Sequence, residues 1–360
     1  GTTGCDAGWA EIGQTWSEPK LGYVRAYGSS KLVMFFGAGY DAPVEDIQPC
    51  GITAYSSTGV TGKATGSTVF PNTQTSAYCG SNLTSGTSTS PSRSMGRGVY
   101  MVDAATGSVL WRVVSSTATS ETVTGMTTVT NSSMKYAIPG DLAVLKNRSN
   151  TAGRGNDTRE SVQSGYIDRV YAADTGGNVW RIDVADSSVS NWVVNKFASV
   201  AGATQSNDAP PAADSPPTKH MRKFMFNPDV VYSSDGNGDY DSVLLGSGDR
   251  EHPFDQTVVN RFYAFKDYNT GTITPAMMSP PSTPPSTITE SNLTDLTDDC
   301  LQSTSLCTGS NTQTSVASSL LANKGWYVTL SNSGEKVIAP ATTDRKSTRL
   351  NSSHGYISYA

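Results

Sequence analysis

The feature that most constrains the fold is a strand–turn–strand unit that recurs along the chain. Its clearest copy spans residues 99–112, where alternating residues lead through Asp-Ala-Ala-Thr-Gly into a second strand that ends in Trp-Arg. A close echo spans 170–181, and weaker copies span 262–271 and 326–337. A repeated hairpin cannot bury its apolar face alone, so successive copies have to stack. The repeat predicts an all-β fold, a modified β-propeller of four-stranded antiparallel blades that forms an incomplete ring.

Three residue types in this unit have separate physical roles. The Asp side chain can accept hydrogen bonds from turn amides, the Gly supplies the positive φ of a tight turn, and the Trp packs a large ring against the next blade. The residues expected in these structural roles are Asp103, Asp174, Gly107, Gly176, Trp111 and Trp180. A second interpretation, unrelated hairpins packed as a β-sandwich, is left open by the repeat alone.

A second recurring element is an apolar strand that ends in small residues and an Asp. It occurs at 33–41 and again at 243–249. A continuous apolar run followed by Gly-x-Gly fits an inner propeller strand, where backbones approach closely. No helix follows either copy in the sequence pattern, so neither Gly-x-Gly is interpreted as a dinucleotide site.

Long polar segments separate the repeats, at about 52–95, 114–134, 201–219 and 272–318. Their Ser, Thr, Gly and Pro content predicts loops on the rims, because such segments bury too little apolar surface to offset the entropy of ordering. We expect one propeller domain over 1–343. The last stretch, 344–360, breaks the alternating pattern and is interpreted as a non-native tail.

Composition narrows the classes of partner. The formal net charge is −5, which argues against nucleic acid, since affinity for phosphates comes mainly from Lys and Arg. No apolar run is long enough to predict a transmembrane segment. The chain starts at Gly1 without an initiator Met, which we interpret as the cut edge of a longer protein.

The five cysteines have no CxxC spacing, so zinc and thiol exchange are not indicated. We expect two loop disulfides, Cys50–Cys79 and Cys300–Cys307, with Cys5 left over. Disulfides form in oxidising compartments, so this pattern predicts an extracytoplasmic location.

Four blocks of sequence resemble, in order, the propeller domain of PilY-type proteins of bacterial type IV pili. They are Gly-Gln-Thr-Trp-Ser-Glu-Pro at 13–19, Phe-Gly-Ala-Gly-Tyr-Asp at 36–41, the stretch 168–183, and Leu-Gly-Ser-Gly-Asp-Arg-Glu-His-Pro at 245–253. The resemblance implies type IV pilus biogenesis, surface adhesion and twitching motility. It also implies minor pilins or a pilus-tip complex as partners, a host or abiotic surface as target, and a place at the pilus tip, outer-membrane surface or periplasm of a Gram-negative bacterium.

The same resemblance implies a calcium loop ahead of the strand that starts near Asp168. The matching segment keeps Asp168 and offers Glu160 and Ser164, but it places Val162 where an oxygen ligand is expected. Calcium needs several oxygen ligands, so this loop is degenerate.

A second candidate calcium loop follows from the residues alone. Asp235, Asn237, Asp239 and Asp241 offer oxygens at alternate positions of a Gly-rich segment. The alternative interpretation is an acidic hairpin turn, because Asp, Asn and Gly are also turn residues. Both interpretations stay open at the level of sequence.

The main enzymatic alternative is a periplasmic quinoprotein dehydrogenase that uses pyrroloquinoline quinone, because those propellers share the Asp-x-x-Thr-Gly-x-x-x-Trp repeat. Such enzymes commonly have two adjacent cysteines against the cofactor. This chain differs from them, because no two of its cysteines are neighbours in the sequence. The Asp of the repeat is already explained by its turn role. We therefore predict a non-enzymatic protein, with no pyrroloquinoline quinone and with calcium as the candidate cofactor.

Overall fold

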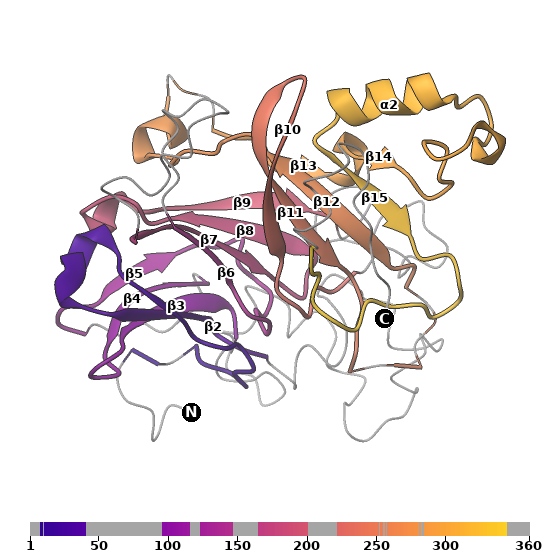
Figure 1. The fold of residues 1–360 in the computed structure, drawn as a ribbon. Coiled ribbons are helices and arrows are strands. Elements are labelled where there is room, and N and C mark those ends of the chain that lie inside the picture. Colours follow the sequence, from indigo (N-terminus) through magenta and orange to yellow (C-terminus); the bar gives the residue numbers. More distant parts are fainter. Residues whose placement is uncertain are drawn as a thin grey trace.

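The computed structural model describes residues 8–9, 11–40, 96–115, 123–146, 165–200, 222–251, 253–254, 256, 258–280, 282 and 284–343. Within these residues the chain forms three sheets of five strands each (Figure 1). The first sheet has the order β1 (Lys20–Gly22), β2 (Val33–Gly37), β3 (Gly98–Asp103), β4 (Val109–Val114) and β5 (Thr127–Thr130). The second has the order β13 (Ile288–Thr289), β9 (Val193–Ser199), β8 (Asn178–Asp183), β7 (Ile167–Ala173) and β6 (Ala143–Lys146). The third has the order β10 (Asp229–Asp235), β11 (Gly238–Gly246), β12 (Arg261–Asp267), β15 (Gly325–Thr329) and β14 (Thr294–Asp295).

All three sheets share one plan. Four strands form an antiparallel meander in chain order, and a short fifth strand lies parallel to the last of them: β5 on β4, β13 on β9 and β14 on β15. The described residues are mostly β, as predicted, although they also include an α-helix. The predicted blade of four antiparallel strands is incomplete, because each sheet is mixed and five-stranded. The described residues form no closed ring. Strands of two to four residues at a sheet edge carry too little alternation to be seen in the sequence.

The two apolar strands with Gly-x-Gly ends, β2 and β11, are the second strands of their sheets, and each is paired on both sides. Their glycines lie where another segment crosses closely. A Cβ added to Gly37 would lie 2.5 Å from the carbonyl oxygen of Ile138, and one on Gly248 would lie 2.5 Å from that of Val337. Only glycine leaves room for these crossings.

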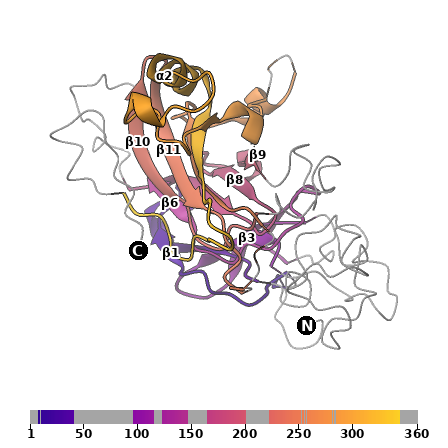
Figure 2. The same ribbon diagram turned by 90° about the vertical axis from the view of Figure 1, so that its right-hand side faces the viewer.

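The segment 272–318, expected as a rim loop, contains ordered elements in the structure. It includes the 3₁₀ turns η8 (Pro275–Met278), η9 (Glu290–Asn292) and η10 (Thr304–Leu306), the strands β13 and β14, and the start of helix α2 (Gln313–Ala322). Thr312 caps α2 in a reciprocal pair with Ser315. Figure 2 shows α2 beside the β10–β11 hairpin. There the side-chain amide nitrogen of Asn237, Nδ2, donates to the carbonyl oxygen of Leu321 at 2.7 Å.

This same segment ties two sheets together. The chain leaves β12 of the third sheet, adds β13 to the second sheet, and returns through η9 to add β14 to the third. We call residues 268–296 the strap. The expected loop at 114–134 likewise contains β5, whereas 52–95 and 201–219 lie outside the described residues. In the segments 114–134 and 272–318, some backbone N–H and C=O groups are bonded to a neighbouring strand. In an unpaired polar loop those groups would be bonded to water instead.

The second sheet lies between the other two, with an apolar core on each face. One core joins the first and second sheets and contains Trp111, Trp180 and Trp192. The other joins the second and third sheets and contains Tyr171, Phe197 and Tyr263 among others. A third cluster covers the outer face of the first sheet, where the Trp9 ring stacks on Tyr100 at 5.4 Å between centroids.

Trp111 and Trp180 are both fully buried in the core between the first and second sheets. The Trp111 ring, from β4, packs against Trp192, which precedes β9, at 5.4 Å between centroids. Each buried aromatic ring of this size stabilises the fold by roughly 1.5–3 kcal/mol. The tryptophans therefore lie between neighbouring sheets, which is where the stacking argument places them.

The two clearest repeats use their Asp residues in the turn. The Asp103 carboxylate accepts from the amide of Ala105 at 2.9 Å, and Gly107 has a positive φ of 73°. The Asp174 carboxylate accepts from the amides of Gly176 and Asn178, both at 2.9 Å. In this second copy the positive φ belongs to Gly177, at 74°, and not to Gly176.

Gly176 is required for a different reason. A Cβ at this position would lie 2.1 Å from a ring carbon of Tyr136, so the turn packs directly under that aromatic ring. The sequence interpretation identified a glycine that the turn needs but assigned it the wrong physical role.

Cys300 and Cys307 form a disulfide in the loop before α2. Cys5, Cys50 and Cys79, with the expected Cys50–Cys79 pair, lie outside the described residues, as does the tail 344–360. No helix in the described part of the chain has the length and apolar character to cross a bilayer.

Candidate functional site at the junction of the second and third sheets

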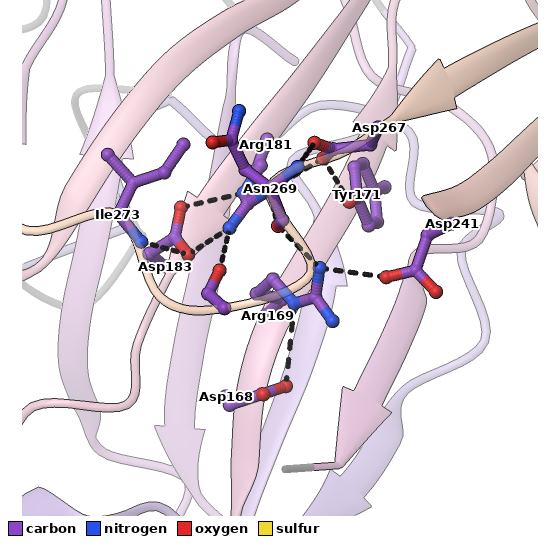
Figure 3. A network of polar contacts seen from close by, with 10 residues as sticks. Asp168, Arg169, Tyr171, Arg181, Asp183, Asp241, Asp267, Asn269 and Ile273 are labelled. Carbon is purple, nitrogen blue, oxygen red and sulfur yellow. Dashed lines mark hydrogen bonds and ion pairs between the residues drawn. The ribbon is translucent and has the colours of Figure 1, made fainter. Parts of the chain in front are cut away.

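The most concentrated set of charged side chains lies buried between the second and third sheets (Figure 3). We call it the ionic junction. Its members are Arg169 and Asp168 from β7, Arg181 and Asp183 from β8, Asp241 from β11 and Asp267 from β12. All six are at most 3% exposed, so their charges interact in a medium of much lower polarity than water.

Arg181 is at the centre of this junction. Its guanidinium makes a two-pronged contact with Asp183, through Nε at 2.9 Å and Nη2 at 2.7 Å, and Nη1 donates to Asp267 at 2.6 Å. Nη1 also donates to the carbonyl oxygen of Asn269 at 2.6 Å, and Nη2 donates to that of Gly271. The fork of Arg donors is thus satisfied by its own strand, by β12 and by the start of the strap.

Arg169 makes the second cross-sheet ion pair. Its Nη1 lies 2.8 Å from the Asp241 carboxylate on β11, and it donates to the carbonyl oxygen of Asn269 at 3.2 Å. Its Nε lies 3.9 Å from the neighbouring Asp168. The hydroxyl of Tyr171 completes the junction by donating to Asp267 at 2.6 Å. Asp241 and Asp267 are opposite each other on β11 and β12 of the third sheet. Each is therefore paired with an arginine of the second sheet, Asp241 with Arg169 and Asp267 with Arg181.

The junction holds four carboxylates and two guanidinium groups, and burial is the main cause that raises the pKa values of two of these carboxyl groups. Burial raises the pKa of Asp168 to about 6, opposed by the nearby Arg169 charge. Burial also raises the pKa of Asp183, although hydrogen bonds from Arg181 pull it down. Burial lowers the pKa of Arg181, but Asp267 and the other neighbours outweigh it, so the net shift is upward and Arg181 stays charged.

Sequence reasoning missed these arginines, although a signal for them was present. The strand that ends in Trp-Arg occurs in both clear repeats, as Trp111-Arg112 and Trp180-Arg181. Arg112 is also fully buried, and its Nη1 donates to the carbonyl oxygen of Gly8 at 2.7 Å. An Arg that recurs beside a core Trp on a β-strand faces the opposite side of the sheet, and burial there requires carboxylates or carbonyls as partners.

The candidate calcium loop at 235–241 forms the turn of the β10–β11 hairpin. The Asp235 carboxylate accepts from Lys266 Nζ at 2.8 Å and from the Tyr268 hydroxyl at 2.7 Å. Burial alone would raise the pKa of Asp235, but these hydrogen bonds and the amide of Asn237 hold it below its ordinary value. The carboxylate is therefore already neutralised by a cation of the protein.

The four predicted ligands do not converge on one point. Asp241 lies opposite Tyr232 in the hairpin, three positions from Asp235 and thus about 10 Å along the strand. Its carboxylate belongs to the ionic junction, while Asp239 lies opposite Ser234 and is exposed. The four residues as arranged do not fit a calcium site, and the acidic-turn interpretation describes this hairpin better.

The other predicted calcium loop is only partly described, because Glu160 and Ser164 lie outside the described residues. Asp168 is 3% exposed, and its Oδ1 accepts no hydrogen bond within the part of the chain that the structure describes. Among those residues no group of three or more His, Cys, Asp and Glu side chains could hold a metal ion.

A second charged cluster fastens the strap. Glu290 Oε1, on η9, accepts from Arg222 Nη1 at 2.7 Å and from the Tyr263 hydroxyl at 2.6 Å, and it lies 2.9 Å from Arg261 Nη1. Arg222 is fully buried and also donates to the carbonyl oxygen of Val259 at 2.7 Å. One carboxylate thus connects the strap to two other segments.

A pocket of about 270 Å³ opens beside the junction. Its walls come from Arg25 on the 3₁₀ turn η1 (Arg25–Ser30), Asp183 at the end of β8, Asp186 after β8, Asn191 on η6 (Val189–Asn191), and residues 272–275 of the strap. The amide of Ile273 donates to Asp183 at 3.0 Å, so the strap closes the wall between this pocket and Arg181. The junction as a whole positions the strap and the third sheet on the second.

No protein-family model matches the chain, and no curated protein matches it significantly. Among solved structures, the crystal structure of the C-terminal domain of PilY1 from Pseudomonas aeruginosa is similar to it, with a TM-score of 0.46 and 14% sequence identity. The match covers 92% of this chain and 54% of that chain, so this chain spans about half the length of that domain. The match is to the type of domain that the four sequence blocks resemble.

Proposed function

We propose that this chain is a non-enzymatic domain of a type IV pilus protein that acts in pilus biogenesis and in surface adhesion. The observation that carries the proposal is where the four blocks of resemblance lie in the fold. The block at 168–183 supplies four of the six charged members of the ionic junction: Asp168, Arg169, Arg181 and Asp183. The blocks at 13–19, 36–41 and 245–253 contact one another through Trp16. Its ring stacks on that of Tyr40 at 5.0 Å between centroids, and its centroid lies 5.8 Å from the guanidinium carbon of Arg250.

This placement supports a scaffold more than a reaction centre. The charged residues of the 168–183 block are paired within the protein, as in the contacts of Arg181 with Asp183 and with Asp267 on β12. Such side chains specify how sheets dock. The proposed partners are minor pilins or a pilus-tip complex and a host or abiotic surface, and the proposed location is the pilus tip, outer-membrane surface or periplasm of a Gram-negative bacterium. The Cys300–Cys307 disulfide supports an oxidising compartment.

Calcium regulation is a further part of this proposal, restricted to the loop that ends at Asp168. A buried carboxylate oxygen with no hydrogen-bond partner in the described residues is a fitting ligand for a hard cation. Isothermal titration of calcium into the chain and into Asp168→Asn, with Asp239→Ala as the matched control, tests this. Loss of binding in Asp168→Asn alone supports the site, and an unchanged isotherm removes it.

The pilus function is tested by deleting the gene that encodes the chain and measuring surface piliation, twitching and attachment. We expect all three to fall, with recovery on complementation by the wild-type gene. Normal twitching and attachment in the deletion strain would reject the proposal. Reduction of a redox dye with alcohols or sugars, dependent on pyrroloquinoline quinone, would instead support the quinoprotein alternative.

A further inference from the structure

An aromatic and cationic stack is formed by segments outside the strands, two that flank the first sheet and two that flank the third. It consists of Tyr40, Trp16, Arg250 and Phe226. Trp16 stacks on the buried Tyr40 ring at 5.0 Å between centroids, yet 46% of Trp16 remains exposed. The Arg250 guanidinium carbon lies 5.8 Å from the centre of the Trp16 ring and 5.8 Å from that of Phe226. The stack therefore joins four separate segments of the chain.

The exposure of this stack is unusual for its residue types. Trp is highly buried on average, and a half-exposed Trp held in place by a second aromatic ring loses little entropy when a partner covers it. Trp, Tyr and Arg are the residues most enriched among those that dominate binding energy at protein interfaces. The composition of the stack is that of an interface centre, and two of its members, Trp16 and Arg250, are exposed.

The free hydrogen-bonding capacity of Arg250 points to the chemistry of the partner. Its side chain is 54% exposed, and its one ion-pair contact in the described residues is Glu251, at 3.7 Å from Nε. Both neighbouring rings lie against the guanidinium, which leaves its N–H edge for a ligand. A guanidinium edge held in this way suits the planar, two-pronged recognition of a carboxylate.

The charges around Arg250 favour the same ligand. Asp249 is paired with the buried Lys223 at 2.8 Å, so it does not compete for Arg250. The amide of Glu251 is held by Asp249 at 3.1 Å, which keeps Glu251 beside the guanidinium but at a long ion-pair distance. An incoming carboxylate can make shorter contacts than Glu251 does.

We propose that Trp16 and Arg250 form a docking site for a partner peptide in which an Asp or Glu lies next to an aromatic or aliphatic side chain. The carboxylate binds the edge of Arg250, and the apolar side chain covers the exposed part of Trp16. This inference does not rest on the proposed pilus function, since it follows from the contacts and exposure of the stack alone.

A displayed library of random heptapeptides, panned on the 360-residue chain, is the probe. Counter-selection uses the double variant Trp16→Ala with Arg250→Ala. We expect peptides that pair Asp or Glu with an apolar neighbour to be enriched on the wild type and lost on the double variant. Replacing the acidic residue of a selected peptide by its amide should abolish binding.

Dissociation constants of a selected, fluorescently labelled peptide then assign the roles. Trp16→Ala should weaken binding about 30-fold, as truncation of an interface hot spot does. Arg250→Lys keeps the charge but loses the planar fork, and should weaken binding about tenfold. Glu251→Gln removes the competing carboxylate and should tighten binding about twofold to threefold. Tyr232→Ala, an exposed aromatic on β10, is the control and should change nothing.

Three results would overturn the proposal. One is enrichment of peptides that bind the double variant as tightly as the wild type, and another is enrichment without any acidic residue. The third is binding of polysaccharides on a glycan array with no selected peptide that depends on Trp16 and Arg250. Circular dichroism of every variant separates loss of binding from loss of folding, and Glu251→Gln, which changes an exposed pair only, keeps the test decisive if Trp16→Ala misfolds.

Discussion

Between the first and second sheets the contact is apolar, with Trp111 packed on Trp192 and Trp180 fully buried nearby. Between the second and third sheets an apolar core is also present, but Arg169 and Arg181 reach across it to Asp241 and Asp267. The two interfaces use the same hairpin repeat in different ways. A close-packed apolar contact depends on the shapes of the two surfaces, whereas buried ion pairs also require that particular charged residues lie opposite each other.

The difference follows from which face of the hairpin meets the next sheet. On β8 the side chains of Trp180 and Ile182 lie in the core with the first sheet, while those of Arg181 and Asp183 lie in the junction with the third. Alternation along one strand therefore supplies an apolar surface on one side and a charged one on the other. Apolar packing alone would keep the three sheets stacked. The ionic junction also fixes how the third sheet is positioned on the second, and where the strap lies.

The largest effect expected is from Arg181→Ala, which breaks the ionic interface. It leaves Asp183 and Asp267 buried without their main cation, so the free energy of unfolding should fall by about 3–5 kcal/mol. Chemical denaturation monitored by tryptophan fluorescence measures this. The triple variant Arg181→Met, Asp183→Leu and Asp267→Leu is the control. It should recover part of the loss, because it removes the unpaired charges but leaves the Tyr171 hydroxyl and the Ile273 amide without their carboxylates. A loss below about 1 kcal/mol in Arg181→Ala would contradict a structural role for the junction.

Trp111→Ala breaks the apolar interface and should cost about 3–4 kcal/mol, because it leaves a cavity against Trp192. Trp111→Phe, which refills most of that space, should recover more than half. The same denaturation experiment checks both variants. Unlike the loss in Arg181→Ala, this loss should not be rescued by changing a charged residue. Equal stability of Trp111→Ala and the wild type would show that the first two sheets do not depend on this ring.

Asp168→Asn sharpens the comparison through pH. The pKa of Asp168 in the folded protein, about 6, is above its ordinary value, so the folded state binds this proton more tightly than the unfolded state. The contribution of Asp168 to stability is present at low pH and is lost as pH rises through about 6. Near neutral pH the Asn variant should therefore exceed the wild type by about 1–2 kcal/mol.

Thermal denaturation in a chelating buffer, which removes any contribution of bound calcium, measures this difference between the two proteins. The gap should narrow below about pH 5, where the wild-type carboxyl is protonated in the fold. A gap that is constant with pH would show that Asp168 does not titrate in this range.

The smallest effect expected is a difference in stability between the Phe variants of Trp180 and Trp111. The indole nitrogen of Trp180 donates to Asp174 at 2.7 Å, whereas that of Trp111 has no hydrogen-bond partner in the described residues. Trp180→Phe should therefore cost about 1 kcal/mol more than Trp111→Phe, because only the first removes a hydrogen bond to a buried carboxylate. Parallel denaturation curves decide this. An equal cost for both would mean that the Asp174 contact contributes no net stability.

Several parts of this arrangement could be predicted from local sequence. The hairpins at 99–112 and 170–181 follow from alternation and from Asp and Gly in the turn, and the structure forms them at β3–β4 and β7–β8. The Cys300–Cys307 pairing involves cysteines close enough in sequence to meet in one loop. Such features depend on residues within one turn of one another, so the sequence contains the whole interaction.

The candidate sites were harder to predict for the opposite reason. Asp241 looked like a member of a local acidic loop, but its carboxylate is 2.8 Å from Arg169, which belongs to another sheet. Asp235 is likewise paired with Lys266 on β12, which lies beyond β11 in the same sheet. A set of metal ligands predicted from sequence spacing assumes that the side chains have no other partners. Here residues on other strands already pair with two of these carboxylates.

The amino-acid sequence by itself determined the all-β class, the repeated hairpin and the burial of Trp111 and Trp180, because period-two alternation and turn chemistry act over a few residues. Tertiary structure alone decided the fifth strand of each sheet, the strap and the partners of Arg169 and Arg181. The physical reason is that a two-residue edge strand or a buried arginine is stable only when a partner from a distant segment satisfies its polar groups.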